Sequence, residues 1–218
     1  MIAVTATGIF GALGVAALAT VVPALWRWTQ LFSTFVHETG HAVVALLSGR
    51  LVTAVEIFFN GGGCTTSYGA PGPLLIPVTA AGYAAPPLIG LALVAALVNG
   101  ASVSTLLLIA LLPVVAILVL SRNLGAVLVV GTVIAALAIL IHRAGPISQT
   151  IAVLIAAWFL LLAGLRDNIE LVRVINQGRG DDASALSELT ALPAEVWVGA
   201  FVAVAALCIY QAGRWLFG

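Results

Sequence analysis

Long apolar runs constrain this chain most, because a run of that kind can cross a lipid bilayer as a single helix. A hydrocarbon core of about 30 Å needs roughly 20 mostly apolar residues in helical form. Runs near this length cover residues 8–26, 31–49, 73–98, 104–120, 124–141, 147–165 and 194–213. The sequence therefore predicts an all-α, polytopic membrane protein with about seven transmembrane helices, within a range of six to eight.

The composition agrees with this class and excludes others. Hydrophobic residues make up 62% of the chain and charged residues 7%, whereas about a quarter of the residues in a soluble domain are charged. The net charge is zero and the eight basic residues, all arginines, form no basic tract, so no nucleic-acid partner is expected. We expect residues 1–218 to form a single integral-membrane domain in contact with the lipid bilayer.

Two connecting segments are longer and more polar than the others. Residues 51–73 have two β-prone stretches around a run of three glycines at 61–63, which is the pattern of a small hairpin. Residues 166–193 hold most of the acidic side chains. Within them, Asp181 or Asp182 precedes a short helical pattern and predicts its N-cap.

The arginines and cysteines give two further expectations. Seven crossings would put the N-terminus on the side of Arg50, Arg122, Arg166, Arg173 and Arg179, and would leave Arg27, Arg143 and Arg214 on the other. The positive-inside rule then predicts a cytoplasmic N-terminus in the plasma (inner) membrane. The two cysteines, Cys64 and Cys208, are too few for a disulfide framework, and both are expected to be buried.

One predicted helix carries three ionisable residues within five positions. The stretch STFVHETGHAVVALL, residues 33–47, contains His37, Glu38 and His41. Side chains four residues apart share one face of a helix, so both imidazoles can point at one metal ion. This is the H-E-x-x-H arrangement, in which zinc lowers the pKa of bound water to about 7. Glu38 would take the proton of that water and return it to the leaving amine.

The motif is informative because the sequence around it is apolar and has few other ionisable residues. Before residue 165 the acidic residues are Glu38 and Glu56, and the one histidine outside the motif is His142. An ionisable group near mid-membrane costs roughly 2.5–3.5 kcal/mol, so such groups are kept for function. His142, beside an arginine at a helix end, is expected to be interfacial. Gly40, within the motif, predicts close packing against another helix.

A hydrolytic zinc site usually takes three protein ligands. The histidine helix ends on the same predicted side as residues 166–193, so a carboxylate from that segment can reach the histidines. Asp182 is the predicted third ligand, with Asp181 and then Asp167 as alternatives. Asp181 or Asp182 can instead cap the following helix, and Asp167 can pair with an arginine. Glu56, in the hairpin, is expected to be solvated.

Three stretches carry a family resemblance. FVHETGHAVVALLSGRLVTAVEI, then GGGCTTSYG, and later DDASALSELTALPAEVW resemble the small integral-membrane relatives of the site-2 protease family of intramembrane zinc metalloproteases. The resemblance covers residues 26 to about 197. It implies a zinc site in the membrane, with His37 and His41 as ligands, Glu38 as catalytic base and a distant aspartate as third ligand.

The pattern around that aspartate follows the smaller relatives, in which an Asp-Ala pair precedes a short helix, a threonine, a proline and a tryptophan. The matching residues are Asp182, Ala183, Thr190, Pro193 and Trp197. The Asn-Pro-rich segment ending Leu-Asp-Gly of the better-known members has no match, and neither has a PDZ-like insertion. The family also has a strand that pairs with unfolded substrate near the site. The hairpin at 51–69 is expected either to do this or to plug the cavity.

Three functions are compatible with these features. The leading hypothesis is an intramembrane zinc-dependent endopeptidase that cuts in or near a transmembrane segment of a membrane-protein substrate. The alternative is a catalytically inactive membrane binding or assembly protein that retains the metal-site scaffold. A small transporter using His37, Glu38 and His41 as an ion site is less well supported, because no discontinuous helix pair stands out.

Overall fold

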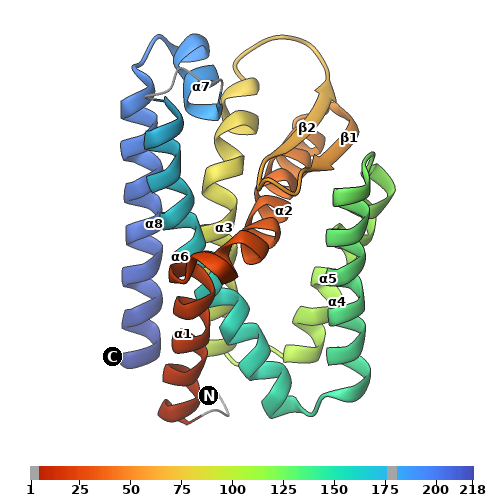
Figure 1. Ribbon diagram of the computed structural model, residues 1–218, viewed down its shortest axis with the longest axis vertical. Coiled ribbons are helices and arrows are strands. Elements are labelled where there is room, and N and C mark those ends of the chain that lie inside the picture. The colour runs from red at the N-terminus through yellow and green to blue at the C-terminus, as the bar shows by residue number, and fades with distance from the viewer. Residues whose placement is uncertain (1–4, 176–180) are drawn as a thin grey trace.

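The computed structural model describes residues 5–175 and 181–218 and is mostly helical (Figure 1). Within these residues it has eight helices and one two-stranded antiparallel sheet. The helices are α1 (Ala6–Val21), α2 (Pro23–Leu47), α3 (Leu75–Val98), α4 (Val103–Leu120), α5 (Leu124–Arg143), α6 (Pro146–Ile175), α7 (Asp182–Thr190) and α8 (Ala194–Phe217). The strands are β1 (Leu51–Ile57) and β2 (Gly63–Tyr68). The predicted helical class, with a hairpin directly after the histidine helix, is confirmed.

The first two helices form one bent path rather than the two separate crossings predicted at 8–26 and 31–49. α1 and α2 meet at 100°. Pro23 starts α2 and has no N–H, so it cannot donate to the carbonyl of Ala19 four residues earlier. The Thr29 hydroxyl donates to that carbonyl instead, at 2.8 Å. Within the described residues, five helices are long and apolar enough to cross a membrane, or six crossings if the bent pair counts as one.

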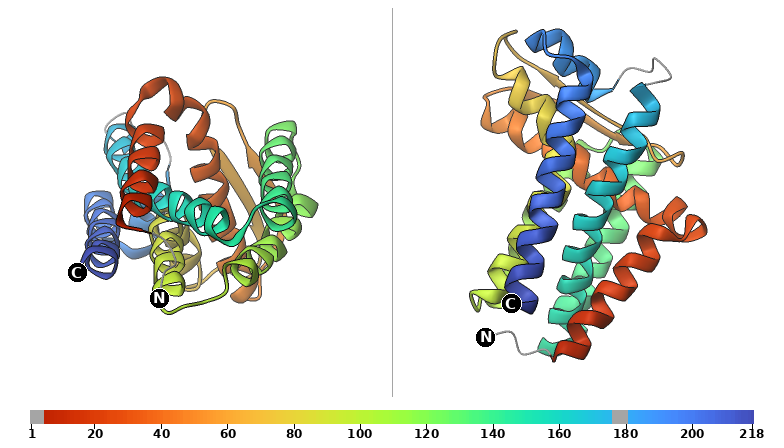
Figure 2. Two further views of the ribbon diagram at one scale, coloured as in Figure 1. Left: turned by 90° about the horizontal axis from the view of Figure 1, so that it is seen from below. Right: turned by 90° about the vertical axis from the view of Figure 1, so that its left-hand side faces the viewer.

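The helices divide into a main bundle and a separate pair. Figures 1 and 2 show α1, α3, α6 and α8 side by side, with α4 and α5 standing apart and α2 running obliquely between the two groups. The start of α1 and the end of α8 lie at one end of the molecule, and the hairpin and α7 lie at the other. Two polar networks hold the α4–α5 pair. Gln149 of α6 donates to Leu140 O at 2.9 Å and accepts from Ser104 at 3.0 Å, and Asn123 fixes the other end to β1.

This arrangement changes the expected grouping of the arginines. Arg50 directly precedes β1, and the backbone N–H of Arg122 donates to Val55 O in β1 at 3.1 Å. Both therefore lie at the hairpin end, whereas α1 starts at the opposite end (Figure 1). The grouping of these arginines with the N-terminus is wrong, because α1 and α2 rise together toward the hairpin. Arg179 lies outside the described residues.

Small residues allow α2, α3 and α6 to pack closely. A Cβ atom added at Gly40 would lie 2.6 Å from Ala85 Cβ and 2.7 Å from Ala81 O. A Cβ atom added at Gly90 would lie 2.7 Å from Ala157 O. Membrane helices associate through such close backbone contacts, since lipid offers no hydrophobic driving force between them. The packing role predicted for Gly40 is confirmed.

The hairpin is fixed to the rest of the molecule along β1. The side chain of Asn123, the N-cap of α5, donates to Ile57 O at 2.9 Å and accepts from Ile57 N at 3.2 Å. Arg122 bonds to Val55 beside it, so the connection between α4 and α5 covers the outer edge of β1. Cys64, on β2, is exposed and its predicted burial is wrong, because β2 lies at the margin of the bundle. Cys208, in α8, is buried.

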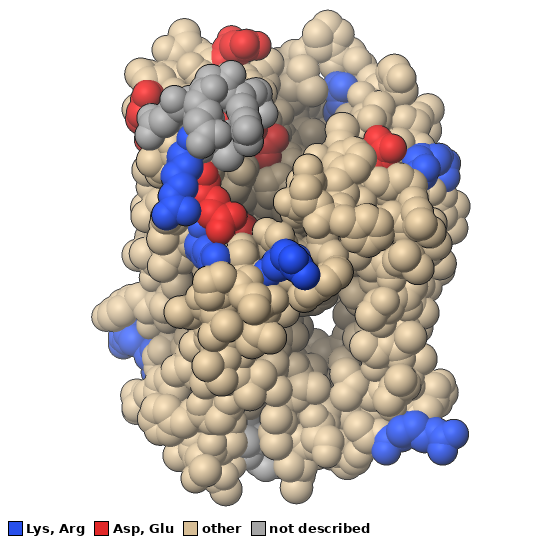
Figure 3. Space-filling model, viewed as in Figure 1, with Lys and Arg blue, Asp and Glu red and all other residues tan. Residues whose placement is uncertain are grey.

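Charged side chains are distributed unevenly over the molecule. On the face seen in Figure 3, the acidic side chains lie in the upper half, at the end of the hairpin and α7, and several of them surround a hollow. Much of the lower half of this face is uncharged. A hollow bordered by acidic side chains therefore opens at the end that carries the hairpin and α7.

Candidate metal centre

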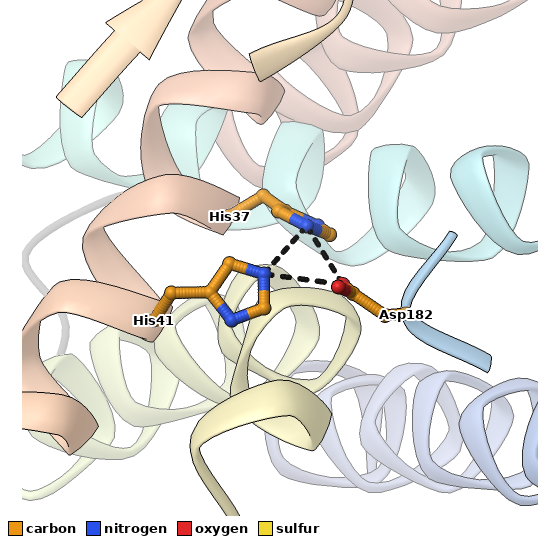
Figure 4. Close-up of side chains that lie close together, drawn as sticks. All are labelled: His37, His41 and Asp182. Atoms are coloured by element: carbon orange, nitrogen blue, oxygen red, sulfur yellow. Dashed lines mark hydrogen bonds and ion pairs between the residues drawn. The ribbon is translucent and has the colours of Figure 1, made fainter. Parts of the chain in front are cut away.

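Three side chains from distant parts of the chain converge at this end of the molecule. His37 and His41 project from α2, and Asp182 projects from the start of α7 (Figure 4). The two Nε2 atoms are 3.0 Å apart, and Asp182 Oδ2 lies 3.1 Å from each of them. The structure thus brings together the three residues that the sequence predicts as metal ligands. Their role as ligands stays a prediction at this point.

The local structure of α7 separates the two neighbouring aspartates. Asp181 caps α7, with its carboxylate accepting from Ser184 N at 2.8 Å, so Asp182 begins the helix and faces the histidines. The end of α7 is tied to α8, since Trp197 Nε1 donates to Thr190 Oγ1 at 3.1 Å. The Thr190 and Trp197 positions of the predicted pattern therefore hold the end of α7, and Asp181 caps its start.

The remaining candidate ligands lie elsewhere. Asp167, on α6, accepts from the Ser33 hydroxyl at 2.5 Å and is outside the group of three. Glu56 is half-buried in β1, paired in register with Cys64. His142 is exposed in the last turn of α5, at the far end of the molecule, where an interfacial residue was expected.

The hydrogen bonding of His41 shows which ring nitrogen is free. His41 Nδ1 lies 2.8 Å from Val78 O, and because a carbonyl can only accept, Nδ1 carries the proton. In the neutral ring Nε2 then presents a lone pair to His37 and Asp182. Such a backbone carbonyl partner is typical of histidines that bind metals.

The three facing atoms fit a zinc ion. Asp182 Oδ2 is buried and has no hydrogen-bond partner, although two imidazole nitrogens lie 3.1 Å away. Electron-rich atoms at this spacing need a cation or extra protons between them. In tetrahedral coordination, zinc bonds of about 2.0–2.1 Å place ligand atoms about 3.3 Å apart. The observed triangle is close to that size, so Asp182, His37 and His41 could hold one Zn²⁺.

A carboxyl group binds a cation in its deprotonated form. Burial works to raise the pKa of the Asp182 carboxyl group, but protonated imidazoles at His37 and His41 outweigh burial and hold this pKa well below its usual range. A bound cation would take the place of those imidazole protons beside the carboxylate. The side chains remain partly accessible, with 18% of His37, 12% of His41 and 22% of Asp182 exposed, so water can reach the group.

Helix α3 forms the wall behind the imidazoles. A Cβ atom added at Gly82 would overlap Nε2 of both His37 and His41, so this position has no room for a side chain. Tyr83 follows, with its ring edge-on to His37 at 4.7 Å between centroids and stacked on Phe201 at 5.3 Å. Neither residue was predicted. The small-residue run AAGYAA in α3 was the available signal, but it does not indicate which helix it faces.

Glu38 is the fourth predicted site residue and lies next to His37 on α2. It is buried, with 4% of its surface exposed, and its Oε2 accepts from the Thr65 hydroxyl of β2 at 2.7 Å. Thr65 was also missed, because nothing in a hairpin sequence indicates which side chain meets a helix. The site therefore draws on α2, α3, α7 and the hairpin.

Comparison with known proteins identifies the family. A family model described as Peptidase M50B-like matches residues 10–212. The chain belongs to this family. M50B-like proteins are intramembrane metalloproteases of the site-2 protease type, so the resemblance found in the motifs is confirmed. No match was found among curated proteins or among solved structures.

Family membership and the geometry of the three side chains both indicate a metal site. Among the residues that the structure describes, the group able to hold a metal consists of His37, His41 and Asp182, and this family typically uses zinc. The M50B-like chain is thus a multi-pass membrane protein with a metallopeptidase family fold.

The close approach of Gly82 gives a direct test of the centre. We expect Gly82→Ala to lower bound zinc from about one ion per chain to near zero, because the added methyl group displaces both imidazoles. Zinc is measured by elemental analysis of protein purified in detergent. Gly131→Ala is the matched control, since nothing lies within 4 Å of a Cβ there. Full zinc content in a folded Gly82→Ala protein would contradict the geometry.

Proposed function

We propose that this M50B-like protein is a zinc-dependent endopeptidase that hydrolyses a peptide bond in or near a transmembrane segment of a membrane protein. The observation that carries the proposal is the triangle of His37, His41 and Asp182, with 3.0–3.1 Å sides. Buried Glu38 precedes His41 by one helical turn. Ionisable groups are costly in an apolar bundle, so their convergence supports a functional site.

The residues of the site have different roles in the proposed peptide hydrolysis. His37, His41 and Asp182 would hold the metal. Zinc, when bound, acts as a Lewis acid and lowers the pKa of water to about 7. Glu38 takes the proton from the attacking water and passes it to the amine nitrogen of the leaving peptide. Three protein ligands leave a fourth position for water or a substrate carbonyl, as hydrolytic zinc sites require.

The hairpin supplies an edge for an extended substrate. The outer edge of β1 is covered by Asn123 and Arg122. Within residues 5–175 and 181–218, β1 is the strand that pairs with β2, and β2 is partly exposed. Strand addition provides main-chain hydrogen bonds with little demand on sequence. We propose that an unwound segment of the substrate pairs with β2.

The arginines support an orientation that differs from the first expectation. Arg50, Arg122 and Arg173 belong to the end that carries the hairpin and α7, whereas Arg143 and Arg214 belong to the opposite end. The positive-inside rule then favours a cytoplasmic hairpin and a non-cytoplasmic start of α1. We propose this orientation for the protein in the plasma (inner) membrane.

Glu38→Gln tests the peptidase directly. We expect the variant to keep its fold and zinc but to lose cleavage by at least about 100-fold, because an amide cannot accept the proton of water. New protein N-termini are counted by mass spectrometry in membranes of cells that express either form. Glu188→Gln, on α7 and outside the group of three, is the matched control. Identical N-termini for wild type and Glu38→Gln would favour the inactive binding or assembly protein.

Cys64 reports the orientation without an engineered label. Partial desolvation of Cys64 by the neighbouring atoms and the charge of Glu38 raise the pKa of its thiol, so labelling is done at about pH 8.5 to increase the reactive thiolate. We expect a membrane-impermeant maleimide to modify Cys64 in inside-out vesicles and not in intact cells. Cys64→Ser is the control for specificity. Labelling in intact cells would reverse the proposed orientation.

A further inference from the structure

Strand β2 touches the proposed catalytic base, and this contact suggests a second role for the hairpin. We infer that Thr65 is a positioning residue that fixes the Glu38 carboxylate, which makes the hairpin part of the catalytic apparatus as well as a substrate edge. This inference rests on the proposed peptidase function.

The hydrogen bond of Thr65 selects one oxygen of Glu38. Thr65 Oγ1 lies 2.7 Å from Glu38 Oε2 and 3.1 Å from Glu38 O. A hydroxyl has one proton to donate, and the shorter of the two contacts is the one to the carboxylate oxygen of Glu38. Hydrogen bonds to a carboxylate are shorter and stronger than those to neutral acceptors. Oε2 is therefore held by Thr65, and Oε1 is left for proton transfer.

Gly63, two residues earlier on β2, preserves space around the other oxygen. A Cβ atom at this position would overlap Oε1, Cγ and Cδ of Glu38. The backbone of β2 thus lies against the carboxylate without covering it with a side chain. Thr65 and Gly63, on the same face of the strand, constrain the two oxygens differently.

The hairpin is itself fixed relative to α2, as a positioning device requires. The Thr34 hydroxyl, one turn before Glu38, donates to Gly61 O in the hairpin turn at 2.7 Å. On the other strand, Asn123 makes two hydrogen bonds to Ile57. These contacts anchor the turn and the end of β1 that pairs with Gly63, close to Thr65 in sequence, so its hydroxyl has a defined position over the helix.

Three variants test whether the hydroxyl of Thr65 positions Glu38. Thr65→Val keeps the shape but removes the donor, and Thr65→Ser restores it. Thr132→Val is the matched control, because the Thr132 hydroxyl donates to Leu128 O within its own helix, α5, at 2.7 Å. We expect Thr65→Val to lower Glu38-dependent cleavage about 10–100-fold, because general-base catalysis contributes about 10²–10⁴-fold and a base held less firmly loses part of it. Zinc content should not change, Thr65→Ser should recover most of the activity, and Thr132→Val should resemble wild type.

A stability measurement tests the contact independently of cleavage. We expect Thr65→Val to lower the midpoint of thermal unfolding by about 2–6 °C. In the Glu38→Ala background the shift should shrink to less than half, because the partner is gone. Equal shifts in both backgrounds would overturn the inference.

The activity results distinguish the two proposals. Loss of cleavage in Thr65→Val without recovery in Thr65→Ser would show a packing role, and wild-type activity in Thr65→Val would show no role. Either result overturns the inference while cleavage that requires Glu38 keeps the peptidase proposal intact. If Glu38→Gln changes no cleavage, the peptidase proposal fails and the positioning role of Thr65 in catalysis fails with it, whatever the unfolding data show.

Discussion

Two imidazole nitrogens and a carboxylate oxygen, held 3.0–3.1 Å apart in an apolar bundle, are the constraint on which the rest of the structure depends. Desolvated polar atoms at such spacing are unfavourable unless a cation or protons lie between them. Neighbouring residues nevertheless hold the two imidazole nitrogens and the carboxylate oxygen at this spacing. Asp181 caps the helix that begins with Asp182, the Val78 carbonyl fixes the ring of His41, and Gly82 leaves room for both imidazoles.

Close packing of helices and side-chain hydrogen bonds together position this centre. Glycines bring α2, α3 and α6 together, which gives the site rigid walls where lipid cannot drive association. Side-chain hydrogen bonds then place the irregular parts, since hairpins and short helices in an apolar setting need partners for their polar groups. The same contacts that satisfy the backbone of the hairpin put Thr65 on Glu38. The fold and the candidate site thus share one set of interactions.

The sequence predicted those features that depend on local spacing and on composition. The four-residue spacing of His37 and His41, with the glutamate between them, was enough to identify the candidate ligands. The glycine run identified the hairpin, and the pattern after residue 180 identified Asp182. These signals are local, so they can be recognised before the chain is folded.

Features that depend on contacts between distant segments were not predictable in the same way. The bend at Pro23 makes α1 and α2 one bent path. An apolar run on either side of a proline is equally consistent with two separate membrane crossings. Gly82 and Thr65 acquire their roles only when α3 and β2 meet α2. The arginine grouping failed for the same reason, since one bend altered the side on which every later segment was counted.

Zinc X-ray absorption spectroscopy of the purified wild-type protein, repeated for Asp182→Asn and His41→Ala, tests the metal centre most directly. We expect about one zinc ion with two imidazole nitrogens and a carboxylate oxygen at about 2.0–2.1 Å, and weakened or absent zinc in both variants. A zinc-free wild-type protein under metal-replete conditions, or an identical spectrum in both variants, would contradict it.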